Sequence, residues 1–463
     1  MKILLIQPRH IYSPAFSEKR LGHVYLPNSL LASAAIFKKI GIDVKINDEN
    51  INLSNINNNI VGINLVGSPY IPIAINYEKT LKEIFRDNFT LLIGGQVVSG
   101  LNEIDMKSLF SYQTVNGNLT KQISKTFNVD ENEIPKIENI SFIDAYKLIN
   151  EEILKLYLEK EFSFYLSQGC KYSCSFCAAK RTINIKGKET KATEQYRNIN
   201  IALLDFEYLI KKAINFKINE LQIYLSNLDL FQTPFKLMAF AEGVIEIKNK
   251  YSSINIMLRG LSTTQSFLNT HKKYSFVINK MKEAGLQRIG FGIDGATPKV
   301  YKETRKPQKV IDCLNAVRIC REEYDIKPEN LMVFGHNNIE DEDALNEAVK
   351  FCIDMKYQYE AVPRPHIAKD IVPGNDGWFK EENKAIRKMF YEYPSLFQNL
   401  DFTAIPSPFT HPDSKFRDLV TKSYKKVCEL PQSLTQYVLP ELPNMSLEEL
   451  TSVRLHNNEK YDI

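Results

Sequence analysis

Short apolar runs alternate with amphipathic segments of a dozen or more residues along the first third of the chain. The apolar runs have the length of strands buried on both faces and cover residues 2–7, 43–47, 60–66 and 91–93. Between them, residues 26–40 and 72–86 carry apolar side chains at helical spacing. Strands that alternate with helices form a parallel sheet with helices on both faces. Residues 1–130 are therefore predicted to be a Rossmann-like domain, with a ligand crevice at the carboxyl ends of its strands.

A second alternating series follows a less regular, polar linker over residues 131–160, which ends in an amphipathic helix at 148–158. Its predicted strands are 162–166, 221–225, 254–258, 288–293, 330–333 and 359–362. Its predicted helices are 202–216, 235–248, 274–284, 310–322 and 343–355. Five or six βα units in a row predict a partial (βα)6 barrel of the TIM type over residues 161–362, with its active site at the strand C-termini.

Periodicity is lost after residue 362 and proline recurs, so residues 363–463 are predicted to form an α-rich C-terminal cap. The whole pattern belongs to the α/β class. The only tryptophan, Trp378, lies in a turn-rich stretch and is expected to anchor this cap. His366 and Lys369 follow the last predicted strand, where a loop could line a substrate pocket. They are candidates for a proton donor or an anion partner.

Composition narrows the class of protein. The 463 residues are 44% hydrophobic and 25% charged, which is enough apolar material for packed cores. The net charge of +4 is too small for nucleic-acid binding to be the first hypothesis. The start of the chain lacks the features of a secretory signal, and no run approaches the roughly 18 apolar residues of a membrane span. We therefore expect a cytoplasmic protein with reduced thiols.

Three of the seven cysteines, Cys170, Cys174 and Cys177, crowd into eight residues with the spacing C-x3-C-x2-C. They follow the first predicted barrel strand, where catalytic loops lie. Three thiolates on a short loop can each bind one iron of a cubane, and the fourth iron can then be chelated by a small molecule. A structural zinc site would want a fourth protein ligand, for which His10, His23 or His366 would have to come close in space.

The cysteine spacing, with the aromatic Phe176 before the last cysteine, resembles the signature of the radical S-adenosylmethionine (SAM) superfamily. The resemblance implies that the three thiolates hold a [4Fe–4S] cluster whose free iron binds the amino and carboxylate groups of SAM. It also implies a one-electron reductant of the flavodoxin or ferredoxin type. The electron cleaves the sulfonium, and a 5′-deoxyadenosyl radical takes a hydrogen atom from the substrate.

Polar residues at predicted strand ends resemble the SAM-binding positions of that family. Asp294 follows the fourth strand, where the family places an acidic residue, more often Glu, on the SAM ribose. Ser226 and Asn227 stand where short polar residues hold the SAM amine, although the usual Gly-Gly-Glu is absent. Arg259 is placed to pair with the SAM carboxylate or ribose. For Asp294 and Arg259, an ordinary ion pair or a solvated charge is the alternative.

The first domain resembles the cobalamin-binding domain that precedes the barrel in one large subgroup of the superfamily. The matching segments are 26–32, 41–50, 60–64 and 92–97, and Gly94 and Gly95 are the expected contacts of the cofactor. The DxHxxG motif is absent, as is usual in this subgroup, and Gln96 and Val97 stand where a histidine is expected. Val115–Asn118 replaces an acidic glycine-rich segment. We expect the fold to be kept, and cobalamin occupancy stays open.

With cobalamin, the resemblance implies methylation of an unactivated carbon. Without it, a radical rearrangement or another hydrogen abstraction is the alternative, and a non-catalytic metal-binding protein is the alternative from a different class. The substrate is expected to be a small molecule, a lipid or a peptide. The basic segment 180–197 is either a lid over an acidic substrate or a solvated loop. The remaining thiols are expected to be buried: Cys313, Cys320, Cys352 and Cys428.

Overall fold

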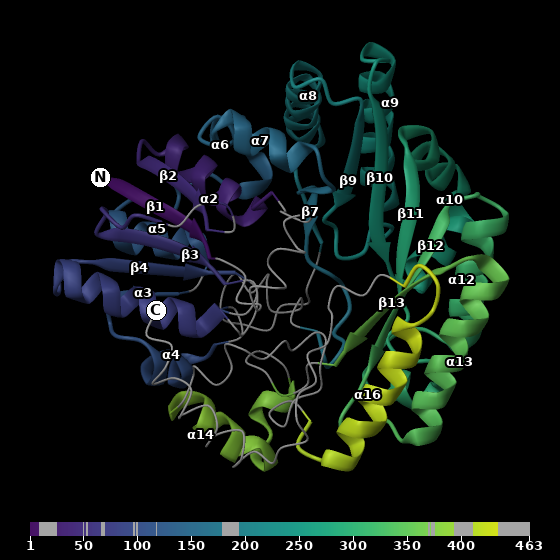
Figure 1. Ribbon diagram of the computed structural model, residues 1–463. Helices are drawn as coiled ribbons and strands as arrows, with labels where there is room; N and C mark the ends of the chain where they lie inside the picture. Colours follow the sequence, from purple (N-terminus) through teal and green to yellow (C-terminus); the bar gives the residue numbers. More distant parts are fainter. Residues whose placement is uncertain are drawn as a thin grey trace.

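The computed structural model describes residues 1–8, 26–49, 51, 54–65, 70–95, 98, 101–116, 118–177, 194–368, 371, 376–392 and 411–433. Two parallel sheets lie side by side, each with its own set of helices (Figure 1). None of the described helices is both long enough and apolar enough to cross a bilayer.

The first sheet has the strand order β2-β1-β3-β4-β5. Its strands are β1 (Lys2–Gln7), β2 (Asp43–Asp48), β3 (Ile60–Asn64), β4 (Thr90–Gly94) and β5 (Thr114–Val115). All its neighbouring strands are parallel, as predicted. The order reverses direction between β1 and β3, which places the ligand crevice of such a sheet at the carboxyl ends of these two strands.

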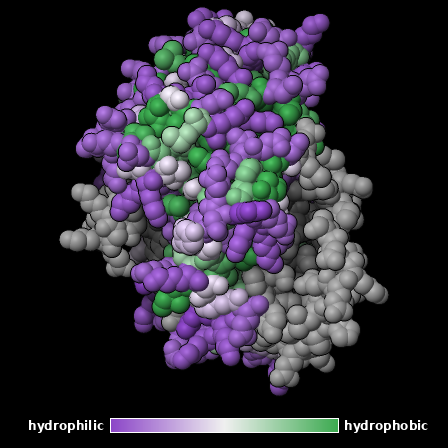
Figure 2. All heavy atoms as spheres, turned by 90° about the vertical axis from the view of Figure 1, so that its left-hand side faces the viewer, coloured by the Kyte–Doolittle hydropathy of each residue, from purple (hydrophilic) through white to green (hydrophobic). Residues whose placement is uncertain are grey.

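Alternation along β1 explains the two layers of helices around this sheet. Ile3 and Leu5 belong to one core, and Leu4 and Ile6 belong to another, because successive side chains of a strand point to opposite faces. The first core includes α2 (Asn28–Lys39) and α5 (Leu119–Phe127), and the second includes α3 (Ile71–Phe85) and α4 (Glu103–Leu109). Seen from the side of this domain, hydrophobic residues are scattered among hydrophilic ones (Figure 2).

The second sheet has the order β13-β12-β11-β10-β9-β6, and every neighbouring pair is parallel. Its strands are β6 (Phe162–Phe164), β9 (Glu220–Leu225), β10 (Asn255–Ser262), β11 (Leu286–Gly292), β12 (Lys327–Phe334) and β13 (Val362–Ile367). Its helices are α8 (Ile199–Asn215), α9 (Pro234–Lys250), α10 (Thr264–Ala284), α11 (Pro298–Glu303), α12 (Val310–Glu322) and α13 (Glu342–Tyr359). The longer helices cover the outer face of a curved sheet (Figure 1). Within the described residues its edge strands β6 and β13 do not pair, so the predicted partial barrel is confirmed as an open one.

The last predicted strand, 359–362, was wrong in its placement. Tyr359 ends α13, and the strand is β13, which includes the Pro363–His366 stretch that we had assigned to a loop. Proline cannot donate to a strand ladder, so it marks edge strands, and β13 pairs only with β12. Several further elements are longer than predicted. Among them, β10 continues to Ser262 and α10 begins at Thr264.

The described parts of the C-terminal cap are helical, as predicted, but they pack in two places. Trp378 is fully buried, and with α14 (Lys384–Glu392) it joins the core of the first domain that contains Leu4 and Ile6. The other helix, α16 (Ser414–Cys428), lies along α13 and contacts β13 (Figure 1). Trp378 is therefore an anchor, as expected, and what it anchors is the first domain.

The linker is helical and fixed to the barrel. It contains α6 (Ile143–Tyr146) and α7 (Glu151–Leu158). A fully buried ion pair between Arg197 and Asp205 holds its start: Asp205 accepts from the Phe142 amide at 2.9 Å, and Arg197 donates to the Ile140 carbonyl at 2.9 Å. The Arg197 guanidinium also lies 4.1 Å from the centre of the Phe142 ring. These contacts set how the chain enters β6.

Candidate functional site

The cysteine loop begins where a short two-stranded sheet opens. β7 (Ser167–Gln168) pairs antiparallel with β8 (Gln195–Tyr196), and Gly169 follows β7 with φ of 99°, a conformation that favours glycine. Cys170, Cys174 and Cys177 are all partly buried on the loop that leaves this sheet. Residues 178–193, which include most of the basic segment, lie outside the described residues.

One side of the cysteine loop is held from the segment after β9. Gln232 accepts from the Lys171 amide at 2.5 Å and donates to the Gly169 carbonyl at 3.3 Å. The Tyr172 hydroxyl lies 3.4 Å from the Ser266 hydroxyl at the start of α10. Because both anchors follow barrel strands, the loop lies at the carboxyl ends of those strands.

The other side of the loop is held from the segment that follows α11. The Ser175 amide donates to the Thr304 carbonyl at 3.0 Å, and Arg305 Nε donates to the Ser173 carbonyl at 3.2 Å. Most of these bonds use loop backbone groups, so they fix the path of the loop without involving the sulfur atoms.

Burial changes the acidity of the thiols on this loop. Burial, together with the neighbouring cysteines, raises the pKa of the Cys170 thiol to about 12 and that of the Cys174 thiol to about 11. Among the described residues no three ligating side chains converge on one ion. Thiolates that each bind a different iron of a cube have no common centre to share. Because burial raises the pKa of Cys170 and Cys174, loading these two thiols with metal must release protons.

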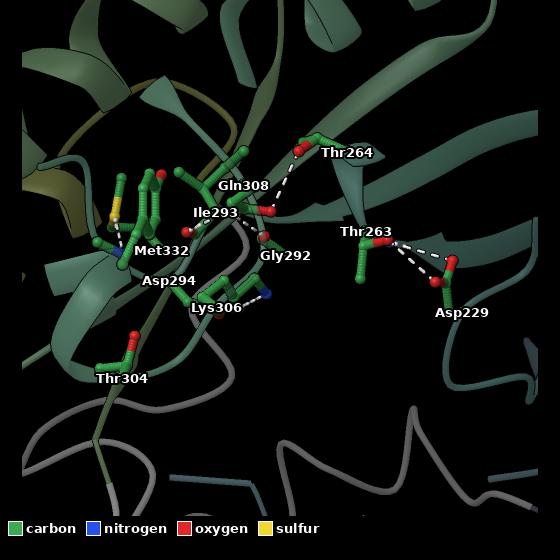
Figure 3. A network of polar contacts seen from close by, with 12 residues as sticks. Asp229, Thr263, Thr264, Gly292, Ile293, Asp294, Thr304, Lys306, Gln308 and Met332 are labelled. Carbon is green, nitrogen blue, oxygen red and sulfur yellow. Dashed lines mark hydrogen bonds and ion pairs between the residues drawn. The ribbon is translucent and has the colours of Figure 1, made fainter. Parts of the chain in front are cut away.

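A buried ion pair stands beside Cys174. Asp294 follows β11 with φ of 53°, and its carboxylate accepts a hydrogen bond from Lys306 Nζ (Figure 3). The charge of Lys306 acts to lower the pKa of Cys174, although burial raises it more. Gln308 fixes this corner by donating to the Gly292 carbonyl at 3.1 Å and to the Ile293 carbonyl at 2.8 Å. Sequence reasoning identified Asp294 and missed Lys306, which no motif marks.

Ser226 and Asn227 lie at the end of β9, as predicted, and support the base of the cysteine loop. The Ser226 hydroxyl donates to the Phe164 carbonyl at 3.1 Å. The Asn227 amide nitrogen donates to Ser167 Oγ at 2.6 Å and to Tyr196 Oη at 3.1 Å, and so connects β7 to β8. The amide oxygen of Asn227 is buried and has no hydrogen-bond partner among the residues that the structure describes. That oxygen is an unsatisfied acceptor at the site.

Asp229, which the sequence did not single out, is fully buried next to Cys170. It accepts from Ser266 Oγ at 2.6 Å and from Ser262 Oγ at 3.0 Å. It also accepts from Thr263 Oγ1 at 3.0 Å (Figure 3). Burial raises its pKa, and these hydrogen bonds act in the opposite direction. A run of hydroxyl residues after a strand could have indicated such a carboxylate cage.

Arg259 requires a correction. It lies inside β10, and its guanidinium pairs with Glu329, which is fully buried, and with Glu161 at 3.3 Å. Arg364 of β13 pairs with the same Glu329 carboxylate at 2.7 Å. The ordinary ion pair that was the alternative for Arg259 is what the structure shows, because the strand continues four residues beyond the predicted end.

Two histidines lie on or just after barrel strands. His366 lies in β13, opposite Val333 of β12, and its neighbour Lys369 lies outside the described residues, as do His10 and His23. His336 was missed: it is fully buried just after β12, with its ring 5.0 Å from the ring of Phe176. Its position three residues after the end of the predicted strand 330–333 could have indicated it. Phe176 is thus packed against the barrel mouth.

The carboxyl edge of the first sheet is open at one glycine and closed at the next. A Cβ on Gly94 would meet nothing within 4 Å, whereas one on Gly95, at φ of 109°, would lie 2.3 Å from the Leu65 carbonyl. Beside them, Asn64 donates to Gln7 at 2.8 Å. Gln96 and Val97 lie outside the described residues, and Asn118 caps α5.

Comparison with known proteins agrees with this geometry. Residues 164–348 match the family described as the Radical SAM superfamily. No curated protein is similar enough in sequence to serve as a relative.

Two solved structures share the fold. One is the radical S-adenosylmethionine methyltransferase TsrM from Kitasatospora setae, at 13% identity and a TM-score of 0.54, over 79% of this chain and 72% of TsrM. The other is the cobalamin-dependent S-adenosylmethionine radical enzyme OxsB, at 13% identity and a TM-score of 0.55, over 76% of this chain. The match spans about half of OxsB, 51% of that chain. Residues 164–348 therefore match the radical SAM superfamily, and the chain as a whole shares the fold of TsrM and OxsB.

Proposed function

We propose that the protein is an enzyme that cleaves SAM reductively, with Cys170, Cys174 and Cys177 as the ligands of a [4Fe–4S] cluster. The observation that carries the proposal is a three-thiol loop held by backbone hydrogen bonds at the carboxyl ends of parallel barrel strands. When bound and reduced, the cluster would supply the electron that cleaves the sulfonium of SAM. The chain's own residues position the loop and exclude water around it.

Two groups beside the loop suit the ends of SAM. The unsatisfied Asn227 oxygen and the Ser226 hydroxyl are proposed to receive the ammonium, because a buried acceptor without a partner is costly and an ammonium would satisfy it. Asp294 is proposed to accept from the ribose hydroxyls, with Lys306 paired to its carboxylate. Phe176, packed against His336, is proposed to line the same site. His366 and Lys369 stay candidates for contacts with the substrate.

The experiment is anaerobic reconstitution with iron and sulfide, followed by dithionite and SAM, and chromatography for 5′-deoxyadenosine. The Cys170→Ala variant is expected to lose both the brown chromophore and the product. Cys428→Ser, which removes a thiol far along the chain on α16, is the matched control and is expected to keep both. An intact chromophore with no 5′-deoxyadenosine would contradict the proposal.

For the reaction outcome, we propose methylation of an unactivated carbon with cobalamin in the first domain. The open sheet edge at Gly94 supports it, as does the shared fold with enzymes described as cobalamin-dependent. Purification with cobalamin supplied should give corrinoid absorption bands, and Gly94→Leu should weaken them while the cluster absorbance stays. Absence of corrinoid bands from the wild-type protein would favour a cobalamin-free hydrogen abstraction or rearrangement instead.

A further inference from the structure

Exposed aromatic rings gather beside the cysteine loop, where α9 begins and α10 breaks. Phe235 in the first turn of α9 is 54% exposed, and Phe276 on α10 is 47% exposed. The ring of Tyr274 lies between them, 4.9 Å from that of Phe235 and 6.3 Å from that of Phe276. Tyr274 leaves the helical conformation, with φ of −146° and ψ of 46°, which turns α10 at this point. Large apolar side chains exposed as a group mark interaction surfaces.

Lysines lie next to these aromatic residues in the sequence. The chain segments that carry the rings contain no carboxylate side chains. Lys236 follows Phe235, and Lys272 and Lys273 precede Tyr274; all three are exposed and none forms an ion pair with a described residue. Residues 231–241 and 264–276 contain neither Asp nor Glu. We call this region the aromatic–lysine surface, made of Phe235, Lys236, Lys272, Lys273, Tyr274 and Phe276. Its charge is complementary to an acidic partner.

The aromatic–lysine surface is continuous with the turn that carries Cys170. Gln232, three residues before Phe235, bonds the backbone on both sides of Cys170, at Gly169 and Lys171. The first turn of α10 reaches the same loop through the contact of Ser266 with Tyr172. A protein seated on this surface would lie next to the first thiol, and electron transfer falls steeply with distance.

We propose that the aromatic–lysine surface docks an acidic one-electron carrier protein that reduces the cluster. The inference rests on the proposed function, in which each reductive cleavage of SAM consumes one electron that a donor outside the protein must supply. The carrier is oxidised by one electron and the cluster is reduced by one; no bond is made or broken and no proton moves. A small surface suits this partner, because electron-transfer encounters are transient and bury little area.

The test compares two double charge reversals in the reconstituted holoenzyme. Lys272→Glu with Lys273→Glu alters the surface, and Lys79→Glu with Lys82→Glu makes the same charge change on α3, on the other side of the molecule (Figure 1). Flavodoxin hydroquinone is mixed with each protein at low ionic strength, and bleaching of the cluster absorbance is followed by stopped flow. We expect the first variant to be reduced about 10-fold or more slowly than the second, with a weaker flavodoxin dissociation constant.

Dithionite separates this inference from the proposed function, because it reduces the cluster without docking. The surface variant should form 5′-deoxyadenosine with dithionite at the wild-type rate. Its flavodoxin-driven rate should lose the salt dependence that the wild-type rate shows. Phe276→Ser, at an exposed position, should slow the flavodoxin reaction and keep its salt dependence.

Three outcomes would overturn the docking surface. One is an equal rate of reduction by flavodoxin in the two double variants. Another is a surface variant whose 5′-deoxyadenosine formation falls as much with dithionite as with flavodoxin. The third is a change of oligomeric state in the surface variant, which would make the surface a contact between copies of this chain. If the wild-type protein forms no 5′-deoxyadenosine with dithionite, the proposed function fails. The flavodoxin dissociation constants of the two double variants then still decide the docking surface.

Discussion

At the scale of single residues, buried charge on the barrel strands concentrates on one carboxylate. Glu329 of β12 is fully buried and shared by Arg259 of β10 and Arg364 of β13. Burial alone would raise the pKa of Glu329, but the two guanidinium groups hold it below its ordinary value. The carboxylate therefore ties three parallel strands together across the inner layer.

Glu329→Gln should destabilise the protein by about 3–5 kcal/mol at pH 7, because it leaves two buried cations without their partner. In the unfolded chain the Glu329 carboxylate takes up a proton at about pH 4.3, which is above its lowered pKa in the folded state. The stabilisation is therefore complete above that pH and is lost as pH falls through the folded pKa. Urea unfolding of both proteins from pH 7 to pH 3.5 measures the difference, which should shrink in acid. A difference independent of pH would show that the charge is irrelevant.

At the scale of elements, the linker is fastened to the barrel by polar contacts as well as by apolar packing. Asp205 on α8 and Arg197 just before it bond the backbone at residues 140 and 142. Arg197 also directly follows β8, the strand Gln195–Tyr196 that pairs with β7 at the base of the cysteine loop. The Arg197 guanidinium therefore positions both the segment that leads into β6 and the base of the cysteine loop.

Arg197→Met should cost about 3–5 kcal/mol, because Asp205 would stay buried without its cation. The free energy of unfolding in urea measures the loss. The matched control is Lys211→Met, which removes a half-exposed cation from Glu207 and should cost below about 1 kcal/mol. Equal losses in the two variants would contradict the role of the buried pair.

At the scale of the whole molecule, the C-terminal region closes the first domain. Trp378 packs edge-on against Phe390 of α14, at 5.2 Å between ring centres, inside the core that also contains β1 and β3. A segment more than 300 residues away along the chain thus completes that core. The first domain is expected to depend on this segment for its stability.

Trp378→Ala should cost about 3–5 kcal/mol, the range for removing a large buried aromatic side chain. Trp378→Phe keeps most of the contact and should cost less than half of that. Thermal unfolding followed by circular dichroism compares the two variants. Because Trp378 is the only tryptophan, its fluorescence should also report unfolding of the first domain in the wild-type protein. An Ala variant as stable as the Phe variant would contradict the packing.

Much of this architecture follows from local pattern. The apolar runs and the amphipathic segments are properties of neighbouring residues, and they predicted both sheets and the parallel direction of their strands. The C-x3-C-x2-C spacing is also local, and it singled out the three thiols. The errors fall where local pattern is ambiguous. Pro363 and Pro365 look like a loop until β13 is known to be an edge strand, and Arg259 looks terminal until β10 is seen to continue.

The chain by itself determined which residues can do chemistry: three thiols on one loop, with polar residues after the strands that surround it. Only the tertiary structure decided their partners. In the tertiary structure Lys306 pairs with Asp294, His336 packs against Phe176, and Arg259 forms an ion pair with Glu329. These contacts join residues from 12 to 160 positions apart, and a contact of that kind depends on how sheets and helices pack, which the local periodicity of a sequence does not record.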